Sequence, residues 1–323
     1  MTRQNYGMIR NLLLALALGA LTAPATAQPG GKVIHLVSPF AAGGARELLA
    51  RSFYTELGKE LGQTVIVENR PGAGGAVGTT SVAKAAPDGL TLVFAASSHN
   101  ITALLSPNAG YDPIQDFTPV ANVGMQSYVL MTSAQLPAKS VGEFIAYAKA
   151  NPGKLNYSSP GHGSSGHLAM AYFCKLAGID MVHIPYKSTQ DATNDVLAGR
   201  SHALIVPNVG ATPYIHDQRI RLIGVSSPKR SQFLPGVPAI NEQLKGYVFE
   251  SWFGILGPKD TPRAIVDRIN AAVAKVLKEP EVLKRLATQG VEPRPLTPEA
   301  FGKLLQEDHD EMAKVVKTVG KVD

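Results

Sequence analysis

The chain has 323 residues, and 31 Lys and Arg against 25 Asp and Glu give a formal net charge of +6 at pH 7. The basic residues are scattered, with no stripe and no interleaved aromatic residues, which excludes the usual footprint of a nucleic-acid-binding protein. Cys174 is the single cysteine, so an intramolecular disulfide is excluded and stability must come from burial.

The first 27 residues have the pattern of a cleaved secretory signal peptide. Arg3 and Arg10 precede an apolar core at 12–21, and Ala25-Thr26-Ala27 forms a small-residue cleavage site. Residues 1–27 contain no acid, so the formal charge falls from +6 to +4 when they leave. The sequence therefore predicts a soluble secreted protein of 296 residues (323 minus 27).

Alternating strand and helix patterns predict a first α/β unit after the signal peptide. We expect strands at 33–37, 63–67 and 90–95, separated by helices at 46–57 and 77–85. Apolar strands in this alternation are typical of a parallel sheet that is covered on both faces.

A second α/β unit is expected after an extended stretch at 119–132. Its predicted strands are 155–158, 181–184, 203–206 and 220–225, and its predicted helices are 140–150, 167–176 and 190–198. A strand at 252–256 is expected to return to the first unit. The helices that follow, from Thr261 on, at 280–289 and at 298–319, should pack outside the first domain because no strand remains for them. The predicted domains are residues 28–126 with 252–323, and residues 127–251.

Three glycine-rich loops, at 38–46, 69–75 and 158–166, are predicted to follow strands. Ligands of open parallel sheets lie beyond the carboxyl ends of the strands, where these loops fall. Paired glycines bring backbone amides close to a ligand, and the first turn of a helix adds unpaired N–H groups and the positive end of its dipole. An anion site is therefore predicted between the first and third loops. Tight turns without a ligand remain the alternative, which we favour for 69–75.

Two catalytic or cofactor interpretations are weaker. Gly72 and Gly74 are followed by Val77 where a dinucleotide fingerprint needs glycine, so no cofactor is predicted. Ser164 and Ser165 lie beside His162 and His167, but without the G-x-S-x-G elbow of a hydrolase. The serines are better explained as helix caps or ligand contacts. The sequence has no H-E-x-x-H motif or clustered carboxylates, so no metal site is predicted.

Several motifs in one order resemble the periplasmic substrate-binding proteins of tripartite tricarboxylate transporters, the Bug-type receptors. The motifs are Pro39-Phe40-x-x-Gly43-Gly44, the stretch 67–75 (VENRPGAGG), the stretch 83–89 (AKAAPDG), Tyr111-Asp112-Pro113, the stretch 148–157 (AKANPGKLNY), the stretch 183–187 (HIPYK) and Ser251-Trp252-Phe253-Gly254. The resemblance covers nearly the whole mature chain.

This resemblance implies an α/β fold of the type II periplasmic-binding-protein kind, with two doubly wound domains and a ligand cleft between them. It implies a monomeric, non-enzymatic receptor that closes on a small carboxylate and delivers it to membrane permease subunits. The ligand-binding residues that we predict are Phe40, Ala42, Gly43, Gly44, Arg46, Glu47, Ser97, Ser98, Ser159, Gly161, His162, Gly163, Ser164, Ser165, Thr189 and Asn208.

The chain departs from the family pattern around the predicted ligand. Ala45-Arg46-Glu47 stands where Pro-Thr-Asp is usual, and His162 replaces a common Asn. Our hypothesis is that Arg46 and His162 add cationic donors that select a dicarboxylate or an aromatic acid. A solvated surface pair of Arg46 and Glu47 is the alternative. For the whole protein, the alternatives are an extracytoplasmic hydrolase that uses Ser164 and a ligand sensor that feeds a signalling partner.

Overall fold

The computed structural model describes residues 32–40, 42, 45–106 and 108–319. The predicted signal peptide therefore lies outside the described residues. The strands are β1 (Ile34–Ser38), β2 (Val65–Asn69), β3 (Thr91–Ala96), β4 (Phe117–Ser133), β5 (Asn156–Ser159), β6 (Val182–Pro185), β7 (Ala203–Pro207), β8 (Ile220–Val225), β9 (Glu250–Pro258) and β10 (Glu292–Pro293). The helices are α2 (Ala45–Arg51), α3 (Tyr54–Leu61), α4 (Ala76–Ala83), α5 (Ser98–Leu105), α6 (Val141–Ala150), α7 (Ser165–Ala177), α8 (Thr189–Leu197), α9 (Asn208–Ala211), α10 (Arg263–Val276), α11 (Pro280–Thr288) and α12 (Pro298–Val319).

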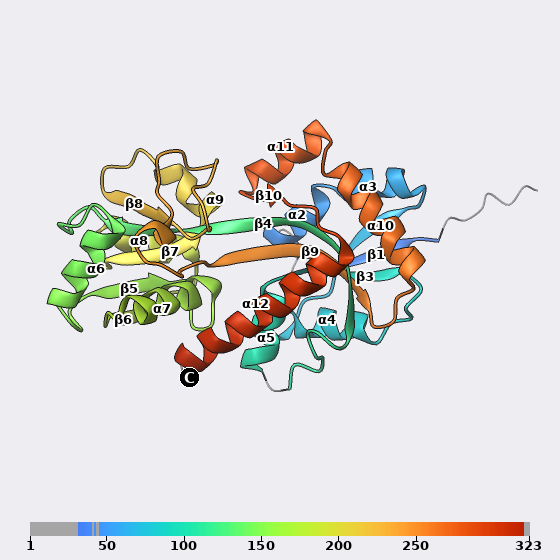
Figure 1. Ribbon diagram of the computed structural model, residues 1–323, viewed down its shortest axis with the longest axis horizontal. Helices are drawn as coiled ribbons and strands as arrows, with labels where there is room; N and C mark the ends of the chain where they lie inside the picture. Colours follow the sequence, from blue (N-terminus) through green and yellow to red (C-terminus); the bar gives the residue numbers. More distant parts are fainter. Residues whose placement is uncertain (1–31, 41, 43–44, 107, 320–323) are drawn as a thin grey trace, which may run out of the picture. The chain divides into compact units, whose positions relative to one another are not determined.

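The sheet has two parallel parts joined by two antiparallel strands. Its order is β2-β1-β3-β9-β4-β7-β5-β6, and β8 and β10 both pair with β4. Strands β1, β2 and β3 are parallel, as are β5, β6 and β7. The long strands β4 and β9 lie side by side between these parts (Figure 1). We call β1–β3 with their helices the first half, and β5–β8 with theirs the second half.

Strand β4 changes partners at one point along its length. It pairs with β9 as far as Ser127, and with β7 and β8 from Tyr128 and Val129 onward. This change lies beside the expected boundary at 126/127. The residues from Val33 onward nevertheless form one compact unit, so the domain boundaries stay a prediction.

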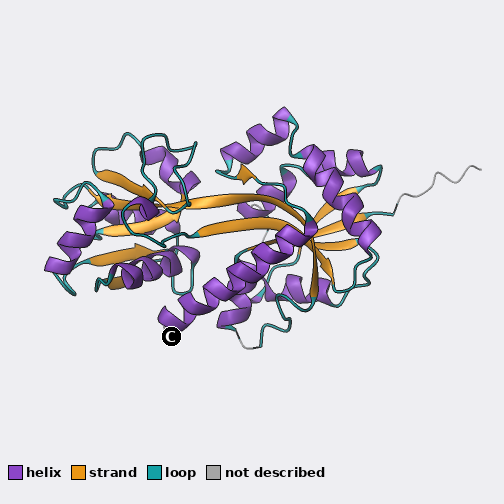
Figure 2. Ribbon diagram, in the orientation of Figure 1, coloured by secondary structure: helices purple, strands orange, loops and turns teal. Residues whose placement is uncertain are grey.

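Helices pack on both faces of each half of the sheet, as buried parallel strands require (Figure 2). In the first half, Leu36 and Phe94 face the core formed with α10, whereas Val37 and Val93 face the core formed with α4. Neighbouring residues of one strand point to opposite faces, so both sets are buried. The continuous apolar runs of the sequence therefore predicted these strands correctly.

The expected helix at 46–57 is wrong as a single element. The structure has two helices, because Ser52 and Phe53 bond to Leu49 and Ala50 three residues back and the helix restarts at Tyr54. Phe53 has φ −140° and is fully buried. Its ring packs on that of Phe94, with centroids 5.7 Å apart. The break lets this ring enter the core.

The placement of the C-terminal helices also needs correction. A strand does remain after residue 256, because Glu292 and Pro293 of β10 pair with Met125 and Gly124 of β4. Helix α12 is not confined to the first half either. Its early residues Phe301 and Leu305 pack in the first-half core, whereas Met312 and Val315 pack in the core of the second half.

Candidate functional site

A cavity of about 260 Å³ lies where residues of both halves meet. It is lined by Leu49, Gln126, Tyr128, Pro160, Ser165, Gly166, Thr189, Ile205, Val206, Pro207, Val209, Ser251, Phe253, Gln289 and Val291. Pro160, Thr189 and Pro207 follow or end the parallel strands β5, β6 and β7. The cavity therefore lies at the carboxyl edge of these strands, where α/β sheets bind ligands.

The loop between β5 and α7 is shaped by small residues and one serine. Gly161 and Gly163 have φ of +124° and +71°, conformations that L side chains rarely adopt. Ser164 caps α7: its Oγ accepts a hydrogen bond from the His167 amide at 3.3 Å and donates one to the Gly161 carbonyl at 2.7 Å. The cap fixes where the helix begins.

Gly166 lets the first turn of α7 approach β7 closely. A Cβ on this residue would lie 2.6 Å from the Ile205 carbonyl oxygen, a distance that real Cβ atoms do not reach. Helix and strand can touch here only because the side chain is absent. The close approach holds Ser165 and Gly166 at the wall of the cavity.

Two helix N-termini meet at this cavity. Helix α7 has 13 residues and begins at Ser165, and α8 has 9 residues and begins at Thr189. The first amides of a helix have no partner within the helix, and the aligned dipoles place partial positive charge at that end. None of the described lining residues is Lys, Arg, Asp or Glu. The arrangement therefore favours an anion held by amides and hydroxyls and not by a fixed opposite charge.

The opposite wall is largely apolar. Leu49 comes from α2, Phe253 from β9 and Val291 from the segment that leads into β10. Gln126 of β4 donates a hydrogen bond through Nε2 to the Gln289 carbonyl at 2.8 Å, which holds its amide at the cavity. An apolar wall facing a polar one suits a small molecule with a short hydrocarbon part and a charged end.

Comparison with known proteins identifies the family. A family model described as "Tripartite tricarboxylate transporter family receptor" matches residues 49–321. The chain belongs to this family. Protein BugT of Bordetella pertussis is 32% identical over 309 residues, covering 94% of this chain and 95% of that protein.

Solved structures of similar proteins confirm the predicted fold class. A Rhodopseudomonas palustris protein with adipate has a TM-score of 0.73 at 32% identity, covering 89% of this chain and 97% of that one. MatC from the same species with bound malate has a TM-score of 0.69 at 31% identity, covering 88% and 98%. The chain is a periplasmic solute-binding receptor and not an enzyme. Among its described residues, no helix is both long and apolar enough to cross a membrane.

Only some of the predicted site residues line the cavity of this receptor. Ser165 and Thr189 do so. Ser159, Gly161, Gly163 and Ser164 instead build the loop that positions the start of α7. Their role in ligand binding stays a prediction, with an indirect contribution through loop shape.

Three other predicted residues are engaged elsewhere. Ser97 is buried, and its Oγ accepts a hydrogen bond from the Trp252 amide at 3.1 Å. Ser98 begins α5, a helix that the sequence did not predict. Asn208 is 1% exposed and donates through Nδ2 to the Gly290 carbonyl at 3.0 Å, joining α9 to the end of α11. None of these lines the cavity among the described residues.

The first loop can be assessed only in part. Gly43, Gly44 and the side chain of Arg46 lie outside what the structure describes, and Ala42 is an exposed turn residue. The Phe40 ring packs over Gly75: a Cβ there would lie 3.2 Å from the ring. The Phe40 carbonyl accepts a hydrogen bond from Asn69 Nδ2 at 2.9 Å. The loop after β1 thus rests on the loop after β2.

The alternative of a solvated surface pair of Arg46 and Glu47 is wrong for Glu47. Its side chain is buried, with the whole residue 3% exposed, and it forms an ion pair with Arg51 one turn along α2. This ion pair joins two residues four apart on α2 and so supports that helix itself. Glu47 does not line the cavity among the described residues.

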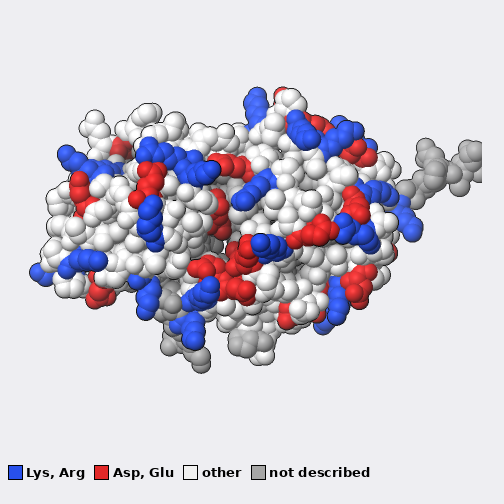
Figure 3. Space-filling view, viewed as in Figure 1, with Lys and Arg blue, Asp and Glu red and all other residues white. Residues whose placement is uncertain are grey.

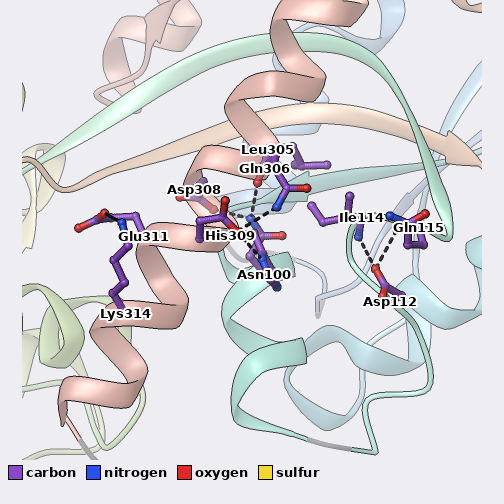
Figure 4. Close-up of polar contacts among 11 residues, drawn as sticks. Asn100, Asp112, Ile114, Gln115, Leu305, Gln306, Asp308, His309, Glu311 and Lys314 are labelled. Carbon is purple, nitrogen blue, oxygen red and sulfur yellow. Dashed lines mark hydrogen bonds and ion pairs between the residues drawn. The ribbon is translucent and has the colours of Figure 1, made fainter.

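A buried polar cluster joins β9, α5 and α12. The Asp308 carboxylate accepts hydrogen bonds from Asn100 Nδ2 at 2.7 Å and Trp252 Nε1 at 3.0 Å. Figure 4 shows Asp308 of α12 turned toward Asn100. Burial raises the pKa of Asp308 to about 6, against the lowering effect of hydrogen bonds from Trp252, Asn100 and Ser97. We call these four residues the Asp308 cluster.

Four of the lining residues that the sequence analysis missed come from the crossing strands. Gln126 and Tyr128 of β4 and Ser251 and Phe253 of β9 are distant in sequence from every glycine-rich loop. A possible indication was the position of Gln126 and Ser251 beside the expected domain crossings at 126/127 and 251/252. Residues at such crossings face a cleft between domains.

Proposed function

We propose that this receptor captures a small dicarboxylate, or an aromatic acid, and delivers it to the membrane subunits of a tripartite tricarboxylate-type transporter. One carboxylate would accept hydrogen bonds from the first turns of α7 and α8. The single observation that carries the proposal is the convergence of two helix N-termini on a cavity whose described lining residues include no Lys, Arg, Asp or Glu. Adipate and malate occupy similar proteins of Rhodopseudomonas palustris, which supports the same ligand class here.

We further propose that residues 28–126 with 252–323, and residues 127–251, are domains that close on the ligand. Closure driven by a ligand requires contacts that favour the closed state. A molecule held between Leu49 and Phe253 on one side and Ser165 and Thr189 on the other makes such contacts with both. A receptor for a signalling partner would close in the same way, so partner identity needs a separate experiment.

The hydrolase alternative receives no support from the geometry of Ser164. Its Oγ bonds to the Gly161 carbonyl and the His167 amide. The ring of His183 pairs instead with Ser159, at 2.7 Å. Within the described part of the chain, no histidine ring forms a hydrogen bond with the Ser164 hydroxyl that could activate it.

Filling the cavity tests the proposed binding site. Val209 lines the cavity and is 38% exposed, so Val209→Trp adds volume at its mouth without disturbing the core. Ile215, 42% exposed and not among the described lining residues, provides the control Ile215→Trp. Titration calorimetry with malate, adipate, benzoate and acetate would measure affinity for both variants and the wild type.

We expect a di- or aromatic carboxylate to bind the wild type and Ile215→Trp equally, and Val209→Trp at least tenfold more weakly, a change of about 1.4 kcal/mol. Equal affinity of all three proteins would place the ligand elsewhere and reject this site. Arg46→Ala in the same titration tests the predicted cationic donor. It should weaken malate more than acetate, since only malate has a second carboxylate for Arg46.

A further inference from the structure

Three histidines from three separate elements gather beside the start of α7. His162 lies in the loop after β5, His167 in the first turn of α7 and His183 in β6. Each offers one ring nitrogen such that the three nitrogens all lie within 4.8 Å of one another. The ring centroids of His162 and His167 lie 4.9 Å and 4.0 Å from that of His183.

The fold holds two of these rings in place. The rings of Tyr157 and His183 are stacked at 4.9 Å, and those of His183 and His167 at 4.0 Å. His167 is buried, His183 is half-buried and His162 is exposed. The third histidine faces solvent, which gives an ion a route to the cluster.

The hydrogen bonds of His183 leave one of its nitrogens available. Its Nε2 lies 2.7 Å from Ser159 Oγ, and that hydroxyl can accept its proton while donating to the Gly161 carbonyl at 3.1 Å. Its Nδ1 is buried and has no hydrogen-bond partner among the described residues. A metal-binding histidine characteristically has one nitrogen bonded to a neighbour and the other free.

The donor atoms of the cluster indicate which ions it suits. Three imidazole nitrogens with no carboxylate among them are a donor set suited to Zn²⁺, Co²⁺, Ni²⁺ or Cu²⁺, and poorly suited to Mg²⁺ or Ca²⁺.

We propose that His162, His167 and His183 form a binding site for one divalent transition-metal ion, with Zn²⁺ as its representative. Nitrogens around a tetrahedral zinc ion lie about 3.4 Å apart, so the three nitrogens must draw together by up to about 1.4 Å. The stacked rings of His167 and His183 cannot direct lone pairs at one ion while parallel, so one ring turns as the ion binds. The fourth position stays open to water.

Metal binding would break one hydrogen bond. His167 Nδ1 accepts from the Gly163 amide at 3.1 Å, and the bond is lost if this nitrogen takes the metal. Gly163 has φ +71°, and a Cβ on it would lie 3.2 Å from Leu105 of α5. The displaced amide can turn to water, because the loop is only half-buried at this point.

The test uses full-length mature receptor without a polyhistidine tag, stripped of metal with a chelator. Zinc binding is measured by competition with a chromogenic indicator, and bound metal per chain by elemental analysis after gel filtration. The variants are His162→Ala and His183→Gln, and the matched control is His216→Ala, which removes another exposed histidine. Thermal unfolding confirms that each variant is folded.

We expect one zinc per chain in the wild type and in His216→Ala, and at least a tenfold loss of affinity in His162→Ala and His183→Gln. His162 is exposed, so its replacement leaves the fold intact and keeps the test decisive even if His183→Gln is unstable. Failure of the wild type to bind zinc would overturn the proposal. Unchanged affinity in folded His162→Ala, or an equal loss in His216→Ala, would do the same.

Discussion

The cavity and the Asp308 cluster both include residues of β9, and the residues are neighbours in sequence. The two regions differ in whether their hydrogen-bond donors have an acceptor within the chain. Ser251 of β9 lines the cavity, whereas Trp252 donates to Asp308. Successive strand residues point to opposite faces, which separates the two regions. In the cluster, the buried donors of Trp252 and Asn100 have an acceptor within the chain. At the cavity, the first amides of α7 and α8 have none within their helices. Satisfied donors hold structure, whereas open donors are available to a ligand.

Removal of the shared acceptor should give the largest effect on stability. Asp308→Ala leaves Trp252 Nε1 and Asn100 Nδ2 without their carboxylate. We expect the free energy of unfolding to fall by about 2–4 kcal/mol, because Trp252 Nε1 loses its acceptor and Asn100 Nδ2 keeps only the Leu305 carbonyl at 3.1 Å. Urea unfolding monitored by tryptophan fluorescence measures it.

The control for this prediction is Glu307→Ala, the neighbouring residue on the same helix, whose carboxylate is exposed and makes only a loose ion pair with Lys303 at 3.6 Å. It should change stability by less than about 0.5 kcal/mol. If the two variants lost equal stability, the cluster would not be the structural support that the comparison assigns to it.

Glu250 provides a second test of the comparison between the cavity and the Asp308 cluster. It is a carboxyl group at the start of β9, the strand that contributes to both regions. Burial raises its pKa to about 7, with Arg294 opposing and Glu292 adding to the rise. The folded state therefore keeps a proton that the unfolded state has lost above about pH 4.5. The contribution of Glu250 to stability must fall as pH rises from about 4.5 to 7.

Glu250→Gln should remove this pH dependence. Between pH 5 and pH 8, the wild type should lose on the order of 2 kcal/mol more stability than the variant, measured by urea unfolding at both pH values. Glu279→Gln, at a half-buried position before α11, is the control and should follow the wild type. Parallel curves for the wild type and Glu250→Gln would show that burial at this position carries no cost.

The smallest expected effect on stability comes from removing a helix cap, and it separates the capping role of Ser164 from its effect on ligand binding. Ser164 and Ser140 cap α7 and α6 in the same way, by accepting from the amide three residues on at 3.3 Å and 3.2 Å. Ser164→Ala and Ser140→Ala should each cost about 1 kcal/mol of stability. Of these two helices only α7 begins at the cavity, so of the two variants only Ser164→Ala should weaken carboxylate binding, by roughly tenfold or about 1.4 kcal/mol. Calorimetry with malate measures it, and a matching loss in Ser140→Ala would mean that affinity follows stability alone.

The sequence predicted the strands and the loops of this receptor better than it predicted the side chains of the cavity. Strand positions follow from apolar runs, and the loops after β1, β2 and β5 do lie at the carboxyl ends of parallel strands. The sequence analysis missed the break at Phe53 because Leu49, Phe53 and Leu57 keep helical spacing across it. It missed helix α5 because the polar start of this helix is stabilised by a hydrogen bond from Asn100 to a residue 208 positions away.

The histidine cluster illustrates the same limit. His162 and His167 are close in sequence, but His183 joins them only because β6 pairs with β5 in parallel, which places it opposite Tyr157. No short motif contains all three residues. Charged residues give equally little indication, since Lys and Arg alternate with Asp and Glu over the face seen in Figure 3. Tertiary pairing, and not local pattern, brings the chemistry together.

Helix α12 has one consequence for how such a receptor could open. Its beginning is anchored among Phe301 and Leu305 in one core and its end among Met312 and Val315 in the other. A movement that separated the two halves would have to detach one end of α12 from the core against which it packs. The side chains beneath that end would then be exposed to water. The equilibrium between the open and closed states of the ligand-free receptor would then depend partly on the C-terminal end of the chain, which is distant in sequence from the residues that contact the ligand.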